Sequence, residues 1–223
     1  SLRNNLEMKL KEKENKKVKI IEDFSIAGNY NIAADSLNLS PIYFTLRNKI
    51  SKNIDFQMST TIDPYKIDEN GIKINKLSIE NGKFGRLTYG NFNLNMRFSS
   101  KENKNENLFQ IPWNLNLYYN INYRRPSTES EIIQSLNFDG EISITKKWNL
   151  KFRSGYDLKN KDFTFTSLDL YRDLHCWEMM FNWIPFGNRK SYNFIIRVKS
   201  DILQDLKIEK KKNIFDSNYL SNF

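Results

Sequence analysis

Hydrophobic and polar side chains alternate with a period of two along much of the chain. The clearest run covers residues 109–123, where every odd-numbered position is apolar or aromatic and four even-numbered positions are Asn. Successive side chains of a strand point to opposite faces, whereas a helix would scatter both sets around its circumference. The run therefore predicts one long two-faced strand. Its odd-numbered members are Phe109, Ile111, Trp113, Leu115, Leu117, Tyr119, Ile121 and Tyr123, and its Asn members are Asn114, Asn116, Asn120 and Asn122.

Shorter alternating runs recur along the rest of the chain, and no segment has a convincing helical period. They are separated by tight turns, for example at 146–147, and by longer polar connections such as 63–75. About twelve strands result, which predicts an all-β, antiparallel, up-and-down sheet. We expect Tyr192–Leu206 to be the last strand and residues 209–223 to form an exposed basic tail.

Two kinds of β-protein fit this pattern. No stretch approaches 18 consecutive apolar residues, which excludes a transmembrane helix but leaves a transmembrane β-barrel open. Trp113 and Tyr123 are ten residues apart, or about 25 Å along a membrane normal at a strand tilt near 40°. An outer-membrane barrel has an apolar band of about that height, with aromatic residues at both rims. The pattern favours such a barrel, with the odd-numbered set facing lipid and the four Asn facing the lumen. The alternative is a soluble β-sandwich whose apolar face is its core.

Composition and charge add little chemistry to this picture. The net charge of +9 fits attraction to a polyanion, whether nucleic acid, anionic lipid or lipopolysaccharide phosphate, and equally fits the bias of an AT-rich coding sequence. Cys176 and His175 are the single Cys and the single His, and as strand neighbours they would point to opposite faces. There is no Gly-rich phosphate loop and no metal-spaced set. We therefore expect no enzymatic activity, no cofactor and no nucleic-acid partner.

Several short motifs resemble the LptD family of lipopolysaccharide-assembly proteins. The most specific is Tyr171–Glu178, which reads YRDLHCWE, and it is followed by NWIPFG at Asn182–Gly187. The resemblance extends over most of residues 2–207 and fits the C-terminal part of the family's barrel, so the chain is expected to be a fragment of a longer protein. The other motifs are Asp35–Asn38, Asp63–Tyr65 with Asp68–Gly71, Ile111–Leu115, Val198–Ser200 and Leu203–Lys207.

The resemblance implies a barrel in the outer membrane of a Gram-negative bacterium, with residues 1–208 as its C-terminal part. In the family, lipopolysaccharide passes from a periplasmic jellyroll through a lateral opening between the first and last strands, and an LptE-like lipoprotein plugs the lumen. The implied partners are therefore lipopolysaccharide, this plug, periplasmic jellyroll transport proteins and outer-membrane lipid. A general outer-membrane barrel, such as a diffusion pore, and a soluble β-rich binding protein stay as alternatives. The implied gate-strand residues are Tyr192, Phe194, Ile196 and Val198.

The resemblance also gives Cys176 a candidate role. The family carries cysteine at the matching late-barrel position and pairs it with cysteine in its N-terminal region. An unpaired cysteine in an exported chain suggests a partner elsewhere. If the chain ends in the periplasm after one last strand, the turn at 172–175 lies at the periplasmic rim. The alternative is a small residue without a disulfide partner.

Overall fold

The computed structural model describes residues 1–10, 16–78, 84–100, 111–203 and 205–212, with the side chains of 5–10, 16–20 and 201 left aside. The chain divides into two units, one built from residues 1–96 and 118–134 and the other from 97–117 and 135–223. Strands β7, β8 and β9 contribute to both. Nine strands lie wholly or partly in the first unit. They are β1 (Leu2–Leu10), β2 (Lys16–Ala27), β3 (Ile42–Ser51), β4 (Ile54–Asp63), β5 (Tyr65–Ile67), β6 (Lys73–Leu77), β7 (Arg86–Ser99), β8 (Trp113–Arg124) and β9 (Glu131–Thr145).

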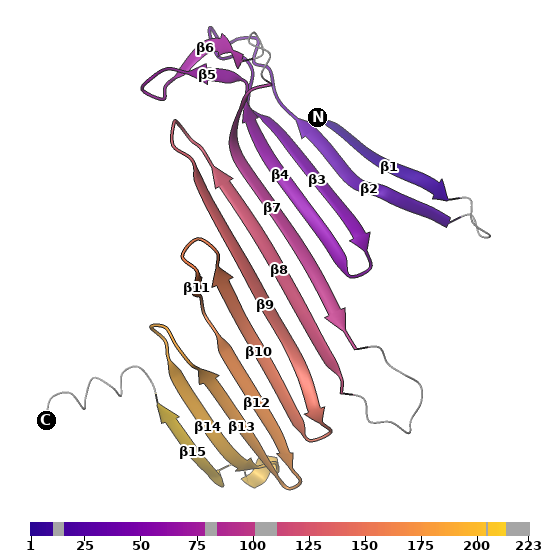
Figure 1. Ribbon diagram of the computed structural model, residues 1–223, viewed down its shortest axis with the longest axis vertical. Helices are drawn as coiled ribbons and strands as arrows, with labels where there is room; N and C mark the ends of the chain where they lie inside the picture. The colour runs from indigo at the N-terminus through magenta and orange to yellow at the C-terminus, as the bar shows by residue number, and fades with distance from the viewer. Residues whose placement is uncertain (11–15, 79–83, 101–110, 204, 213–223) are drawn as a thin grey trace, which may run out of the picture. The chain divides into compact units, whose positions relative to one another are not determined.

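The second unit continues the same antiparallel pattern. Its further elements are β10 (Trp148–Asp157), β11 (Asp162–Phe163), β12 (Ser167–Leu174), β13 (Trp177–Ile184), β14 (Ser191–Val198), the short 3-10 helix η2 (Asp201–Leu203) and β15 (Lys207–Lys212). The strands pair in the order β1-β2-β3-β4-β7-β8-β9-β10-β12-β13-β14-β15, so sequence neighbours are sheet neighbours apart from the β5–β6 and β11 excursions (Figure 1). The prediction of an all-β, antiparallel, up-and-down sheet of about twelve strands is confirmed.

The tight turns follow the sequence pattern closely. Strand β3 ends at Ser51 and β4 begins at Ile54, while β9 and β10 are separated by residues 146–147. Among the described residues, no helix has the length and apolar character needed to cross a membrane.

The connection between β4 and β7 was expected to begin as a polar loop and instead holds a small hairpin. Strands β5 and β6 pair only with each other in a separate two-stranded sheet. Asp68 organises its tip, because its carboxylate accepts the backbone N–H groups of Asn70 and Ile72 at 3.0 and 2.8 Å. This is a side-chain-supported turn of the kind that Asp favours. Figure 1 shows the hairpin at one end of the strands of the first unit.

The end of the chain departs from the expected strand boundaries. The predicted last strand, 192–206, stops at Val198, and a further strand, β15, pairs with β14 from Arg197↔Lys207 to Tyr192↔Lys212. Residues 209–212 of the expected basic tail are therefore strand, and 213–223 lie outside the described residues. This strand is not predictable from alternation, because five of the six residues in its sequence KIEKKK are charged.

Candidate functional site

The first unit has one polar and one apolar face, and both are set by strand register. A single row of paired residues crosses β2, β3, β4 and β7 on each face. The polar row is Asp23, Arg47, Gln57 and Asn93, and the adjacent apolar row is Phe24, Leu46, Met58 and Phe92. Because side chains alternate along every strand, correct register in one row fixes all the others. Hydrogen bonds across strands support the polar face, for example Asn95 Nδ2 to Asp55 Oδ2 at 2.8 Å.

The second unit repeats this separation over six strands. One row carries only polar or charged residues, and the next row is apolar until it reaches β15. The polar row is Glu141, Lys151, Asp169, Asn182, Asn193 and Lys211, and the apolar row is Ile142, Leu150, Leu170, Phe181, Phe194 and then Lys210. Ion pairs reinforce the polar face, where Arg197 Nε and Glu178 Oε1 are 2.6 Å apart. The lumen-facing prediction covers only the Asn residues of one strand, although the same alternation in the later strands indicates these charged residues.

Strand β8 places the predicted residues as the pattern requires. The Asn116 amide donates to Asp139 Oδ2 at 2.9 Å, and the Asn120 amide donates to Asn93 Oδ1 at 2.7 Å. Both acceptors belong to polar faces, so the even-numbered residues of β8 share those faces and the odd-numbered residues share the apolar one. Ile111 precedes the strand, and Phe109 lies outside the described residues. Whether these faces meet lipid and lumen stays a prediction.

The apolar faces have almost no core beneath them. Of the large apolar side chains in the described part of the chain, only Tyr65 is buried, with 5% of its surface exposed. Trp113, Trp177 and Trp183 each keep 40–42% of their surface exposed. A soluble domain of this size buries many Leu, Ile, Val and Phe side chains, and extended apolar surfaces are normally covered by a partner or a membrane. Among the described residues, the apolar residues of the sheet therefore lack a packed core.

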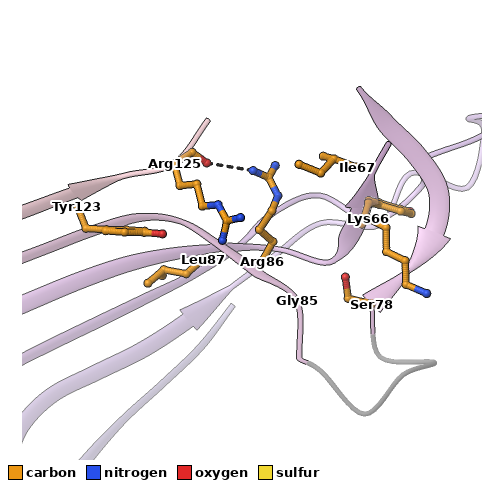
Figure 2. A pocket seen from close by; sticks show the side chains of 9 residues that line it. Lys66, Ile67, Ser78, Gly85, Arg86, Leu87, Tyr123 and Arg125 are labelled. Atoms are coloured by element: carbon orange, nitrogen blue, oxygen red, sulfur yellow. Dashed lines mark hydrogen bonds between the residues drawn. The ribbon is translucent and has the colours of Figure 1, made fainter. Parts of the chain in front are cut away.

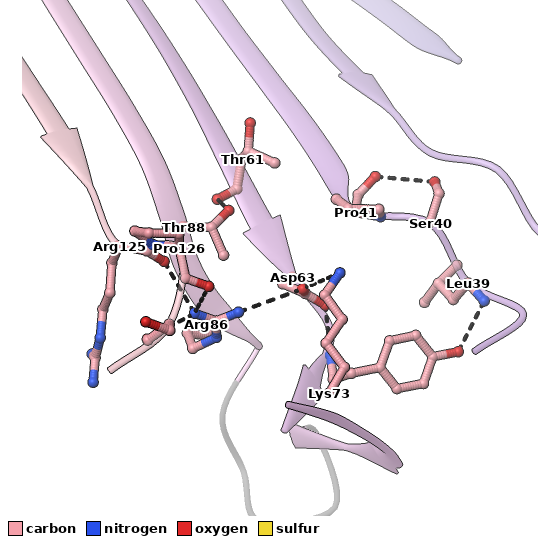
Figure 3. Close-up of polar contacts among 12 residues, drawn as sticks. Leu39, Ser40, Pro41, Thr61, Asp63, Lys73, Arg86, Thr88, Arg125 and Pro126 are labelled. Carbon is pink, nitrogen blue, oxygen red and sulfur yellow. Dashed lines mark hydrogen bonds and ion pairs between the residues drawn. The ribbon is translucent and has the colours of Figure 1, made fainter. Parts of the chain in front are cut away.

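A buried carboxylate joins the β5–β6 hairpin to the sheet in the first unit. Asp63, the last residue of β4, keeps 2% of its side chain exposed and lies 2.7 Å from Lys73 Nζ and 3.6 Å from Arg86 Nη2. Its second oxygen accepts the backbone N–H of Tyr65 at 3.1 Å, and the Tyr65 hydroxyl accepts the N–H of Leu39 at 2.9 Å. We call Asp63, Tyr65, Lys73 and Arg86 the Asp63 cluster (Figure 3).

Arg86 extends this cluster to the connection between β8 and β9. Its Nη1 donates to the backbone carbonyls of Arg125, Pro126 and Ser127 at 3.0–3.1 Å. The connections 28–41, 64–85 and 125–130 are therefore tied together at one end of the first unit, which we call the loop end. The motif Asp63–Tyr65 is part of the family resemblance, but nothing in the sequence indicates which cations form ion pairs with Asp63.

A pocket of about 420 Å³ opens beside the Asp63 cluster. Figure 2 shows Tyr123, Leu87 and Arg125 on one side of Arg86, with Lys66 and Ser78 on the other. Its described lining contains three cations, Lys66, Arg86 and Arg125, and no acidic residue. We call it the Arg86 pocket.

Comparison with known proteins gives one family match, to the N-terminal part of the chain. Residues 1–65 match the family model described as LptD protein. This match supports an LptD-family assignment for the N-terminal part of the chain. The match covers β1 to β4 and the motifs at 35–38 and 63–65, so the resemblance is confirmed there and stays a prediction for the later motifs. No curated protein and no solved structure matches the chain. The match suggests a role in lipopolysaccharide transport or assembly, and the all-β sheet is compatible with an outer-membrane component.

The predicted LptD-type gate residues share one face of β14. Tyr192, Phe194, Ile196 and Val198 pair with β13, and the first three also pair with β15. The strand that carries them is therefore flanked on both sides among the described residues, and β15 is the last strand in the order. Lys210 and Lys212 of β15 stand opposite Phe194 and Tyr192. Lysines at this position are typical of a strand edge that resists unwanted pairing.

Cys176 is exposed and lies in a two-residue turn between β12 and β13. His175, the other turn residue, has a φ of 71° and donates its backbone N–H to Asp173 Oδ1 at 2.7 Å. Lys199 lies in the connection between β14 and β15, and its Nζ is 2.6 Å from Asp173 Oδ1. The hydrogen bond to Asp173 raises the pKa of the Lys199 ammonium. Strand β15 reverses the chain once more, so Lys212 lies at the end of the unit opposite Cys176. The prediction that Cys176 lies at the periplasmic rim assumed that 192–206 is the last strand. That assumption is wrong because β15 follows β14.

Proposed function

We propose that this chain is part of an outer-membrane β-barrel that delivers lipopolysaccharide to the outer leaflet. The observation that carries the proposal is the LptD family match over residues 1–65, at the start of an up-and-down sheet with one apolar and one polar face. A barrel satisfies every backbone hydrogen bond between strands, which is the condition for crossing hydrocarbon without helices. The apolar face then contacts lipid, and the Asn-rich and charged face lines the lumen.

The exposed apolar surface argues against the soluble alternative. A soluble β-sandwich packs its apolar face against a second sheet, yet Tyr65 is the one buried large apolar residue of the described chain. A diffusion pore would share the two-faced sheet, and only the family match argues against it. The distinction between the two barrel functions therefore needs a functional experiment.

Connection lengths support an orientation in the membrane. Outer-membrane barrels have short periplasmic turns and longer extracellular loops. In the first unit the loop end carries the connections 28–41, 64–85 and 125–130, while β3 and β4 are joined at the other end by 52–53. In the second unit, the two-residue turns at 146–147 and 175–176 share one end with the longer connections 100–112 and 199–206, and 158–166 and 185–190 lie at the other end, so connection lengths there do not separate the two ends. We infer from the first unit that the loop end is extracellular, and from the LptD resemblance we propose that Cys176 is periplasmic.

This orientation keeps the disulfide proposal open for Cys176. We expect Cys176 of the full-length, assembled protein to be unreactive toward maleimide until it is reduced, because a partner cysteine in a periplasmic N-terminal region would hold it in a disulfide. The measurement is maleimide labelling of unreduced and reduced protein, with Cys176→Ser as the blank. Full labelling without reductant would show a free thiol and refute the bridge.

The lateral gate and the protein partners rest on the LptD resemblance. We propose that lipopolysaccharide arrives from a periplasmic jellyroll protein, that an LptE-like lipoprotein occupies the lumen, and that release occurs beside the last strands. Strand β14 would then lie next to β15, which forms the edge. It carries the predicted gate residues Tyr192, Phe194, Ile196 and Val198. Such an edge must stay closed or only partly unzipped at rest, because unpaired backbone groups in lipid cost several kcal/mol each.

Depletion in cells tests the function directly. When the full-length protein is depleted, we expect newly made lipopolysaccharide to disappear from the cell surface and to accumulate in the inner-membrane fraction. The measurement is pulse labelling of lipopolysaccharide followed by membrane fractionation and surface detection. Depletion of an unrelated barrel serves as the control. Unchanged surface delivery would contradict the assembly role and favour a diffusion pore.

A further inference from the structure

The Arg86 pocket contains two arginine side chains whose hydrogen-bonding capacity is not used up. The Nε atoms of Arg86 and Arg125 are both buried, and neither has a hydrogen-bond partner in the described chain. A buried donor without an acceptor costs about 1–3 kcal/mol, so such groups normally indicate a missing partner. We propose that the Arg86 pocket binds the phosphate group of a phosphorylated saccharide.

The charge around the pocket requires an anion rather than a neutral ligand. Asp63 is the near carboxylate, and it already meets Lys73 at 2.7 Å as well as Arg86 at 3.6 Å. No ion pair of Arg125 or Lys66 occurs among the described residues, and no described acidic residue lines the pocket. Two arginines and a lysine therefore line one space, and Asp63 is the single carboxylate beside it. An anion entering this space would complete the electrostatic balance.

Phosphate suits these donors better than a carboxylate does. A phosphate monoester presents three acceptor oxygens and up to two negative charges, which matches the planar, multi-donor geometry of two arginines. Burial of Arg86, whose side chain is 11% exposed, strengthens such charge-assisted bonds relative to those of a fully solvated arginine.

The remaining lining fits a sugar ring attached to that phosphate. A volume of about 420 Å³ exceeds what a lone phosphate needs and lies within the range of small-molecule sites. Tyr123 and Tyr65 offer aromatic surface, Ser78 offers a hydroxyl, and Gly85 adds no side chain to the wall. A Cβ at Gly85 would lie 2.5 Å from Ile62 Cγ2 and 2.7 Å from the carbonyl oxygen of Asp63, so this position has to stay free of a side chain.

The sugar phosphate could be a free molecule or the head of a glycolipid, and binding measurements can separate the two. The full-length protein in detergent micelles is titrated calorimetrically with glucosamine 1-phosphate and with glucosamine. In parallel, native mass spectrometry compares the binding of phosphorylated and dephosphorylated lipid A. Saturable binding of the soluble phosphate assigns a free ligand. Phosphate-dependent binding of lipid A alone assigns a glycolipid head. Either result supports the proposal, which needs only the pocket and does not depend on the proposed function.

Arg125 and its neighbour Arg124 provide a matched pair of variants. We expect Arg125→Gln to weaken phosphate-dependent binding at least about tenfold, because it removes a charge-assisted donor from the pocket. The side chain of Arg125 makes no described hydrogen bond whose loss would disturb the fold. Arg124→Gln removes the same charge from an exposed residue outside the pocket lining and should change the affinity less than twofold. Lys66→Gln is a second pocket variant with the same expected direction.

Three results would overturn the proposal. The first is equal affinity for the phosphorylated and unphosphorylated probes. The second is equal weakening by Arg124→Gln and Arg125→Gln, which would indicate a general surface charge effect. The third is no binding of either phosphorylated probe by the folded wild-type protein.

Discussion

Replacement of Leu117 by arginine is expected to cost about 2–4 kcal/mol of folding free energy in a membrane and to block barrel assembly. Leu117 lies on β8, among the odd-numbered residues of the apolar face, and its side chain is half-buried. If this face meets lipid, an arginine near mid-bilayer has neither water nor a counter-charge within easy reach. The measurement is urea titration of the protein folded into lipid vesicles, together with the yield of folded protein in cells.

The matched control for Leu117 is the preceding residue on the same strand. Asn116 shares the polar face and donates to Asp139 at 2.9 Å, so Asn116→Arg would place a cation beside a carboxylate. We expect this variant to assemble with near-normal stability. Equal tolerance of both substitutions would show that the two faces meet the same environment and would contradict the membrane assignment.

Asp63→Asn is expected to destabilise the first unit by about 3 kcal/mol. Asp63 is 2% exposed and is the counter-charge for Lys73 and for Arg86, whose side chain is 11% exposed. Removal of one partner from a buried ion pair leaves the other charge uncompensated, which typically costs 3–5 kcal/mol. Asparagine keeps the size of the side chain and can still accept the N–H of Tyr65. The loss of unfolding free energy therefore reports the removal of the negative charge alone. Denaturant unfolding of the folded protein measures it.

An exposed ion pair of the same sheet provides the comparison. Asp23 pairs with Arg3 at 2.8 Å, but the Arg3 side chain is 76% exposed, so solvent screens this interaction. Asp23→Asn should lose far less stability than Asp63→Asn. Similar losses in both variants would mean that Asp63 makes only a surface contact and that the Asp63 cluster does not hold the loop end together.

The strands were predictable where alternation is strong. Within the predicted run, β8 shows the alternation that the odd-numbered apolar residues predict, because Asn116 and Asn120 bond to polar residues of neighbouring strands. Strand β15 was missed for the opposite reason. It pairs with β14 through backbone hydrogen bonds, and its sole apolar contact in register is Ile208 opposite Ile196.

The loop end could not be predicted from pattern alone. Asp63 and Arg86 are separated by the whole β5–β6 hairpin, and Arg86 then reaches carbonyls about forty residues further along the chain. Contacts of this kind depend on where the loops fold back, which period-two alternation does not encode. The same applies to the Arg86 pocket, because Lys66 and Arg125 have no sequence relationship that would mark a shared site.

The central claim is that the sheet crosses a membrane with its odd-numbered β8 residues in lipid, and spin-label accessibility tests it most directly. Single nitroxide labels at positions 114 to 121, in a Cys176→Ser background, report collisions with membrane-soluble oxygen and with a water-soluble nickel chelate. The account predicts a period of two, with oxygen favoured at 115, 117, 119 and 121 and the nickel chelate favoured at 114, 116 and 120. Uniform access of the nickel chelate along the whole strand would contradict it.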